Sequence, residues 1–303
     1  MTTAPPPRPP RFDPRLVLSF LVITLIWGST WLVIKSQLGV VPPSWSVAYR
    51  FLIGGGAMLL LCLTTGRSLR IGSRGHGFAL AVAVTQFVLN FNLVYRAEAH
   101  VTSGLVALCF ALLLVPNALF AWVFLGQAIR PGFALGAAIG IGGLAILFAP
   151  DLFAATAAAA DLARGIGLTL AAVLSASIAN VLQATPLARR LPTEGTLAWA
   201  MMWGGLIDAG FAWTTAGPPV FDPGLTYVVG LLWLALAASA LAFSLYYAII
   251  RAVGPGVAAY SSVVLPLVAM TLSTLFEGYH WTATGILGGT ATLIGLLVAL
   301  RSR

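Results

Sequence analysis

The residues of this chain that could recognise a solute are amides and hydroxyls set within long apolar segments. Gln86 and Asn90 are four residues apart, which places them on one face of a helix. Ser177 and Asn180, three residues apart, also share a helix face. Amide side chains at lipid depth must face protein or a water-filled cavity. Both pairs are therefore candidates for a solute site, with interhelical hydrogen bonding as the alternative.

Aromatic and small residues accompany these polar groups. Trp199 and Trp203 share a helix face, and tyrosines follow later in the chain. Their rings could stack on an aromatic or aliphatic solute, and core or lipid-facing packing is the alternative. Gly28 lies between Trp27 and Ser29, and its lack of a side chain would let a neighbouring helix approach closely. The predicted cavity residues are Trp27, Ser29, Gln86, Asn90, Ser177, Asn180, Trp203, Tyr246 and Tyr260.

Three charged residues lie within or at the end of apolar segments. An ionisable residue at membrane depth is costly and is a functional candidate by default. Arg50 could instead snorkel to the outer headgroups, as could Lys35. Asp208 could titrate and couple transport to protons, pair with a neighbour, or lie in water near the outer end of its helix.

Two prolines, Pro116 and Pro266, lie in the middle of apolar segments. A proline inside a helix removes a backbone hydrogen bond and kinks the helix. In a protein that changes conformation such a kink can act as a hinge, and a static kink is the alternative. We therefore take both prolines as hinge candidates.

The elements that position these residues must be membrane-spanning helices. Hydrophobic residues make up 59% of the 303 residues, charged residues 8%, and the mean hydropathy is +0.97. Soluble domains carry roughly 25% charged residues, so lipid must replace water over most of this surface. A spanning helix needs about 20 apolar residues, so ten helices would use roughly 200. The predicted fold class is an all-α integral membrane protein.

Ten apolar segments separated by proline, glycine and charged residues give the predicted helices. The predicted spans are Arg15–Lys35, Ser44–Thr65, His76–Arg96, Val101–Leu125, Gly132–Pro150, Arg164–Thr185, Gly195–Thr214, Leu225–Ile250, Gly254–Glu277 and Trp281–Arg301. Residues 1–14, rich in proline and arginine, are predicted to be a disordered cytoplasmic tail without the features of a signal peptide. With that tail inside, most basic residues fall in the inner connections, as the positive-inside rule requires. Both termini are then cytoplasmic.

The second half of the chain resembles the first. Pro116 and Pro266 are 150 residues apart, and Gln127 and Glu277 keep that spacing. Two glycine pairs match in the same way at a spacing of 149, and we predict that they form packing surfaces: Gly136 and Gly140, Gly285 and Gly289. The predicted repeats are residues 15–150 and 151–303. Five helices is an odd number, so the second repeat must be inverted, as in many secondary transporters.

Several motifs resemble the drug/metabolite transporter superfamily of the EamA type. The opening is Trp27-Gly28-Ser29-Thr30-Trp31, followed by Lys35, Pro42-Pro43 and Arg50. The repeat is Tyr95, Pro116 and Leu125-Gly126-Gln127, echoed by Tyr247, Pro266 and Phe276-Glu277-Gly278. The resemblance implies ten helices as two inverted five-helix repeats around a central cavity. Within the superfamily the chain looks most like bacterial exporters of aromatic and other amino acids. Gln127 stands where the family usually has glutamate, which argues against proton coupling at this position.

Other functional classes lack the residues they would need. Cys62 and Cys109 lie in apolar segments, and the three histidines have no zinc-ligand spacing, so we predict no metal and no cofactor. Basic residues between membrane segments do not indicate nucleic acid. A membrane enzyme would need a nucleophile–base or metal cluster, and none is visible. An ATP-driven pump would need a nucleotide-binding domain, for which no connection is long enough.

Two rivals remain on the same fold. A sugar-phosphate or nucleotide-sugar carrier would need several buried cations, and only Arg50 qualifies. A cation-drug exporter would need a carboxylate in the first helix, which has none. We therefore predict a non-enzymatic transporter that exports neutral, including aromatic, amino acids across a bacterial inner membrane by alternating access. Its partners are amino acids and the bilayer, and it is a monomer or homodimer.

Overall fold

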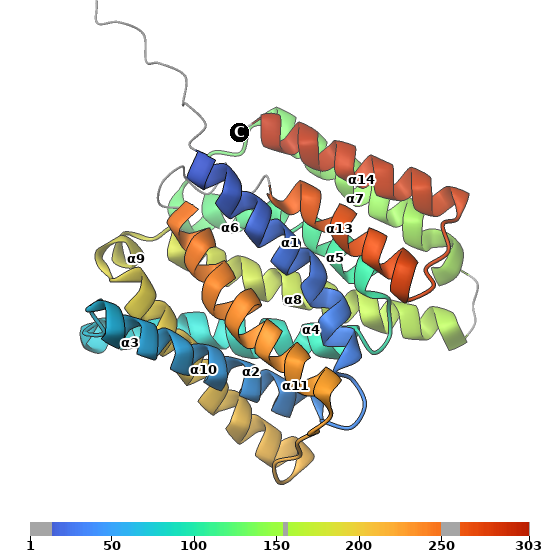
Figure 1. Ribbon diagram of the computed structural model, residues 1–303. Helices are drawn as coiled ribbons and strands as arrows, with labels where there is room; N and C mark the ends of the chain where they lie inside the picture. The colour runs from blue at the N-terminus through green and yellow to red at the C-terminus, as the bar shows by residue number, and fades with distance from the viewer. Residues whose placement is uncertain (1–13, 154–156, 250–260, 303) are drawn as a thin grey trace, which may run out of the picture.

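All regular elements in the described part of the protein are helices (Figure 1). The computed structural model describes residues 14–153, 157–249 and 261–302. The first half contains α1 (Pro14–Ser36), α2 (Pro43–Thr65), α3 (Gly72–Val82), η1 (Ala83–Asn90), α4 (Phe91–Ala97), α5 (Ser103–Ala111), α6 (Leu114–Leu125) and α7 (Pro131–Leu152). The second half contains α8 (Ala157–Gln183), α9 (Pro186–Arg190), α10 (Thr193–Ala216), α11 (Leu225–Leu232), η2 (Trp233–Leu241), α13 (Ser261–Phe276) and α14 (Ala283–Arg301).

Seven helical spans in the described residues are long and apolar enough to cross a membrane. They are Leu18–Ser36, Pro43–Thr65, Gly72–Ala97, Ser103–Leu125, Pro131–Pro150, Ala158–Gln183 and Leu225–Ile249. Two shorter apolar stretches follow, Val264–Phe276 and Ala283–Ala299. The protein is therefore a multi-pass membrane protein, as the composition predicted. The predicted helix boundary from Ile250 to Gly254 lies outside the described residues.

The helices pack mainly as pairs taken from the two halves of the chain. α2 lies along α10, α7 lies along α14, and α13 packs against both α1 and α5 (Figure 1). The start of α1 and the end of α14 lie at the same edge of the molecule in Figure 1. Of these paired helices, α1, α2, α5 and α13 also line the candidate site described below.

Glycines let α2 and α10 approach closely, and the contact is reciprocal. A Cβ atom on Gly55 would lie 2.9 Å from the backbone nitrogen of Met202, and one on Gly205 would lie 2.7 Å from that of Leu52. Leu52 and Met202 are 150 residues apart, as are the two glycines. Each half thus contributes the same contact to the other, which supports the repeat inferred from the sequence.

The glycines predicted to form a packing surface do so on α7, whereas on α14 other glycines make the contact. A Cβ atom on Gly136 would lie 2.3 Å from the backbone nitrogen of Ala299 and 2.5 Å from the carbonyl oxygen of Gly295. Gly289, by contrast, has no atom within 4 Å of its Cβ position. The small residues of α14 that face α7 are Gly288 and Gly295, because crossing helices meet along a face that spacing alone does not specify.

Two predicted helices contain π-helical segments that the sequence did not reveal. η1 begins at Ala83 and η2 at Trp233, again 150 residues apart. In η2 the Ser239 hydroxyl donates to the carbonyl of Leu234, five residues earlier, at 2.8 Å. Such segments rotate the side chains that follow relative to an α-helix and are frequent at functional sites. Both segments contribute to the site or to its support.

The two prolines have different local effects. The helix containing Pro116 is interrupted, since α5 ends at Ala111 and α6 begins at Leu114. There the amides of Leu112 and Leu113 bond to carbonyls three residues earlier, because Pro116 cannot donate to residue 112. Pro266 instead lies within the continuous helix α13. The sequence predicted a kink at each, and the two sites are not equivalent.

Candidate functional site

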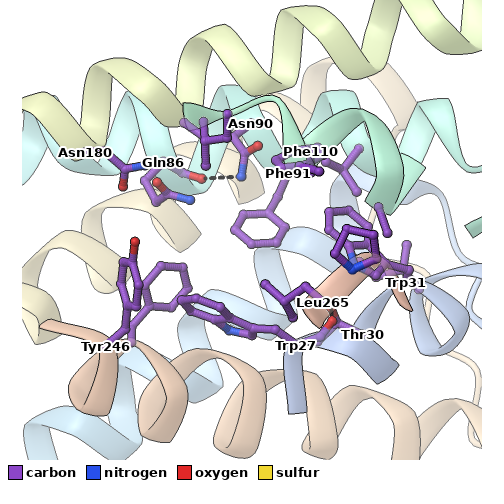
Figure 2. A pocket seen from close by; sticks show the side chains of 18 of the residues that line it. Trp27, Thr30, Trp31, Gln86, Asn90, Phe91, Phe110, Asn180, Tyr246 and Leu265 are labelled. Atoms are coloured by element: carbon purple, nitrogen blue, oxygen red, sulfur yellow. Dashed lines mark hydrogen bonds between the residues drawn. The ribbon is translucent and has the colours of Figure 1, made fainter. Parts of the chain in front are cut away.

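A cavity of about 130 Å³ lies among α1, α2, η1, α4, α5, α8, α13 and the helix that follows η2. One end of this lining is polar and the rest is largely aromatic or aliphatic. Figure 2 shows three amides, Gln86, Asn90 and Asn180, on one side of the cavity and the rings of Trp27 and Tyr246 across from them. The arrangement can hold a small solute that has both polar groups and an apolar side chain.

α1 presents one face to the cavity. Its lining residues are Trp27, Thr30, Trp31 and Ile34, spaced as the i, i+3, i+4 and i+7 positions of a helix. The indole nitrogen of Trp27 donates to the carbonyl of Ala238 in η2 at 3.0 Å, which fixes the ring. Gly28 permits the close approach of α13, since a Cβ atom there would lie 2.6 Å from Val268.

Aromatic rings form most of the apolar wall. The Trp27 ring meets Phe243 and Tyr246 edge-on, with centroids 5.2 and 5.0 Å away. Trp31 and Phe110 lie 4.8 Å apart. The rings contact one another in edge-on or tilted geometries that are favourable for aromatic pairs. Together they give the cavity a surface suited to an aromatic or large aliphatic side chain.

The amide side of the cavity is only partly satisfied by the protein. The Asn90 side-chain nitrogen donates to the carbonyl of Gln86 at 3.3 Å, while its oxygen is buried without a partner among the described residues. The Asn180 nitrogen is 3.4 Å from the side-chain oxygen of Asn117. A buried acceptor without a donor is costly, so the Asn90 oxygen is suited to a donor that arrives with the solute.

Arg50 is the one charged side chain among the described residues that line the cavity. It is 1% exposed, so the alternative of snorkelling to the headgroups is wrong. Its Nε donates to the Ser239 hydroxyl at 2.9 Å, and its guanidinium carbon lies 4.2 Å from the centre of the Phe91 ring. Its Nη1 is buried without a partner among the described residues, and the Tyr95 phenol is its other polar neighbour.

Five predicted site residues with described side chains line the cavity, and three lie elsewhere. Trp27, Gln86, Asn90, Asn180 and Tyr246 line it, as does the hinge candidate Pro266. The Ser29 hydroxyl donates to the carbonyl of Ile26 at 2.8 Å and accepts from Trp233 at 3.2 Å. Two residues beyond Trp27 on an α-helix, Ser29 lies about 200° round the axis, which explains why it faces away.

Ser177 and Trp203 also lie outside the cavity lining. Ala176 and Asn180, four residues apart, form the lining face of α8, and Ser177 is buried beside that face. α10 packs on α2 and α3, so the Trp203 indole meets α3 and its nitrogen is 3.4 Å from the His76 ring nitrogen. Tyr260 lies outside the described residues.

The buried acid Asp208 belongs to a separate polar cluster. It is 0% exposed, and its Oδ1 accepts from the Asn92 amide at 2.6 Å. Arg96 donates to both the side-chain and backbone oxygens of Asn92, each at 3.0 Å. The alternative that Asp208 lies in water is wrong, and the alternative that it pairs with a neighbour describes its position.

Some lining residues were missed by the sequence analysis. Thr30, Trp31 and Ile34 could have been found from their helical spacing relative to Trp27. Phe91, Phe110 and Phe243 carry no such signal, because an aromatic residue in an apolar helix is usually a packing residue. Only the meeting of several helices identifies them as cavity wall.

An apolar helical bundle that encloses a partly polar, solute-sized cavity defines this protein as a membrane transporter by class. The chain belongs to the EamA-like transporter family, which matches residues 15–149 and again residues 163–301. Members of this family are in general transporters and not enzymes. The double match agrees with the 150-residue offsets seen in the helices.

Several known proteins are similar to the chain over most of its length. Protein PagO of Salmonella typhimurium (strain LT2) is 22% identical over 287 residues, which cover 94% of this chain and 92% of PagO. The uncharacterized transporter YvbV of Bacillus subtilis (strain 168) is 22% identical over 273 residues, covering 88% and 85%. A crystal structure 19% identical in sequence superposes with a TM-score of 0.69 and covers 95% of this chain and 98% of its own, which shows a shared fold.

Proposed function

We propose that the protein is a secondary transporter that exports amino acids, chiefly neutral and aromatic ones, across a bacterial inner membrane. The observation that carries the proposal is the cavity itself, whose lining combines Arg50, with its unpartnered Nη1, and a wall of aromatic rings. A guanidinium binds a carboxylate with charge-assisted hydrogen bonds. The side-chain oxygen of Asn90 can accept from an ammonium group, and the rings can pack on the side chain.

The charge of the cavity favours an amino acid over the rival solutes. A sugar phosphate carries up to two negative charges on one group and would need more than one cation. A cationic drug would meet Arg50 without a carboxylate to offset either charge among the described lining residues. A zwitterion brings one carboxylate for Arg50 and is neutral overall.

We further propose ten membrane crossings as two inverted repeats, residues 15–150 and 151–303, with both termini in the cytoplasm. The double family match, the reciprocal glycine contacts of α2 and α10, and the two π segments support this arrangement. Alternating access then follows from movement of one repeat against the other around the central cavity.

Counterflow in liposomes tests the proposed solute. We expect radiolabelled phenylalanine to accumulate against unlabelled phenylalanine, and threonine to compete. Phenethylamine, which lacks the carboxylate, and 3-phenylpropionate, which lacks the ammonium group, should each compete less well than phenylalanine. Counterflow of no amino acid, or stronger inhibition by a sugar phosphate or a quaternary ammonium compound, would overturn the proposal.

The double variant Pro116→Ala, Pro266→Ala tests the hinges. We expect a severalfold slower turnover with little change in the phenylalanine Km, because hinges act on the conformational step. Pro116→Ala should account for most of the effect, because the helix is interrupted between α5 and α6 near Pro116, whereas α13 is continuous through Pro266. Pro43→Ala, at the first turn of α2 where proline is tolerated, is the matched control. Unchanged transport rates in the double variant would exclude the hinge role.

A further inference from the structure

Two carboxyl groups meet one serine at the start of α5. The Ser103 hydroxyl oxygen lies 2.8 Å from Oε2 of Glu98, at the end of α4, and 3.1 Å from Oε1 of Glu277, at the end of α13. The backbone amide of Ser103 also donates to both Glu277 oxygens, at 3.3 and 3.2 Å. Glu277 thus serves as a charged cap for the first turn of α5, where negative charge is favourable.

Glu98 is buried without a cation on its carboxyl group. It is 0% exposed, and its Oε1 has no partner among the described residues. The nearby Lys35 ammonium donates to the backbone carbonyls of Glu98 and, at 3.3 Å, Val101, and forms no ion pair with either acid in the described part of the chain. Burying a carboxylate in this way is unfavourable unless it takes up a proton.

A proton on Glu98 would give both contacts of the Ser103 hydroxyl a donor and an acceptor. The serine hydroxyl has a single hydrogen and can donate it to one carboxylate only. With Glu98 protonated, its O–H donates to the Ser103 oxygen, and the Ser103 hydrogen is donated to Glu277. The pair then carries one negative charge in place of two, and each short contact has a donor and an acceptor.

The pair lies one helical turn beyond the cavity. Glu98 is four residues after the lining residue Val94, and Ser103 is four residues before Ala107, which also lines it. Ser273 of α13 is fully buried against the first turn of α5, where a Cβ atom on Gly104 would be 3.0 Å from its Cβ. Its hydroxyl has no partner among the described residues, so the region holds unused polar groups as well as the carboxyls.

We propose that Glu98 and Glu277 form a proton-binding pair that, when protonated, fastens the end of α13 to α5 and closes this end of the cavity. The proton-binding pair is argued from the geometry alone, and only its coupling to export rests on the proposed transport function. Proton uptake neutralises Glu98. Proton release leaves two negatively charged carboxylates in contact with one serine, and their repulsion drives the helix ends apart. Export of a solute can then be linked to entry of a proton.

The direction of the pH effect follows from burial. Burial raises the pKa of Glu98 well above its usual range, and the nearby Glu277 adds to this, while the Ser103 bond and Lys35 act in the opposite sense. An acid whose pKa is raised in one state stabilises that state below its pKa. The closed arrangement is therefore favoured at low pH and is lost as pH rises through the raised pKa of Glu98.

Other titratable and charged groups lie on or next to the neighbouring elements. They are Lys35 of α1, Tyr95 and Arg96 of α4, His100 between α4 and α5, Asp161 and Arg164 of α8, and Tyr279 and His280 after α13. His100 lies 2.6 Å from Asp161, so its contribution must be separated from that of Glu98.

The variant Glu98→Gln isolates the proton, because its amide reproduces the hydrogen donor of a protonated glutamate. In wild-type protein we expect hydrogen exchange of residues 98–104 and 273–279 to increase by about tenfold or more from pH 5.5 to 8.5, relative to Glu98→Gln at each pH. Phenylalanine counterflow should rise with pH in wild type and stay at its low-pH rate in the variant. Phenylalanine-driven proton flux, followed with an internal pH dye, should be absent from Glu98→Gln.

His100→Gln and Asp208→Asn are the controls, and both should keep the wild-type pH response and proton flux. An unchanged pH response of Glu98→Gln in exchange and transport would overturn the proposal, as would loss of proton flux in Asp208→Asn alone. Uptake driven by a sodium gradient at equal pH would also overturn it. Absence of amino-acid counterflow in wild type would refute the proposed function, and the exchange measurement would still test the proton site.

Discussion

Replacing Arg50 with glutamine is expected to raise the Km for phenylalanine counterflow by about 10- to 100-fold. A hydrogen bond to a charged group contributes about 1.5–3 kcal/mol, and about 1.4 kcal/mol corresponds to a tenfold change in affinity. The Nη1 of Arg50 has no partner among the described residues, and its loss removes the donor that we propose binds the solute carboxylate. Initial rates over a range of phenylalanine concentrations measure the effect.

Two further variants separate binding from structure. Ser239→Ala removes the 2.9 Å bond to Nε but leaves the guanidinium in place, so its Km should change much less. Arg50→Lys retains the charge but loses the planar pair of donors and should be intermediate. The weaker inhibition expected of phenethylamine should persist in Ser239→Ala and disappear in Arg50→Gln. A folded Arg50→Gln protein with the wild-type Km would refute the carboxylate-binding role.

Gly136→Ala is expected to give the largest loss of stability of any single methyl addition on α7. Its new Cβ would lie 2.3 Å from the backbone nitrogen of Ala299 and 2.5 Å from the carbonyl oxygen of Gly295. Neither backbone atom can rotate away, so α7 and α14 must separate by roughly 1 Å to reach normal contact, at a cost of about 1–3 kcal/mol. Thermal unfolding of the purified protein in detergent should show a lower midpoint.

Gly142→Ala is the matched control on the same helix, because no atom lies within 4 Å of its Cβ position. Alanine is a better helix former than glycine, by about 1 kcal/mol in water, so this variant should be as stable as wild type or more stable. Equal unfolding midpoints for the two variants would show that the close contact of α7 and α14 does not contribute to stability.

The local chemistry of the sequence was sufficient to predict the class of protein and most of its helices. Few charges and long apolar segments require a membrane, because only lipid can face such a surface. Where the sequence predicted a kink at Pro116, the structure has an interruption between α5 and α6, since a missing amide acts within one turn. The offset of 150 residues between Pro116 and Pro266 recurs in the starts of η1 and η2, which supports the repeat that we propose from the sequence.

The tertiary structure alone decided which helix faces form the site. Trp27 lines the cavity and Ser29 does not, because two residues along a helix turn through about 200° and only packing selects the inner face. Trp203 was a candidate from the sequence, but the packing of α10 on α3 places its indole nitrogen beside the His76 ring. The π segments shift the angular position of the residues that follow them, which spacing rules for an α-helix do not anticipate.

The same division applies to the charged groups. The sequence by itself determined that Arg50 lies within a membrane helix and that Glu98 and Glu277 lie at helix ends. Two of their contacts come from residues far away in the chain: Ser239 for Arg50, and Ser103 for Glu277, which the same serine joins to Glu98. Composition and periodicity are local properties, whereas burial and partnership arise only when distant helices meet. That meeting places the Arg50 guanidinium in the cavity lining and brings Glu277 to the serine that also contacts Glu98.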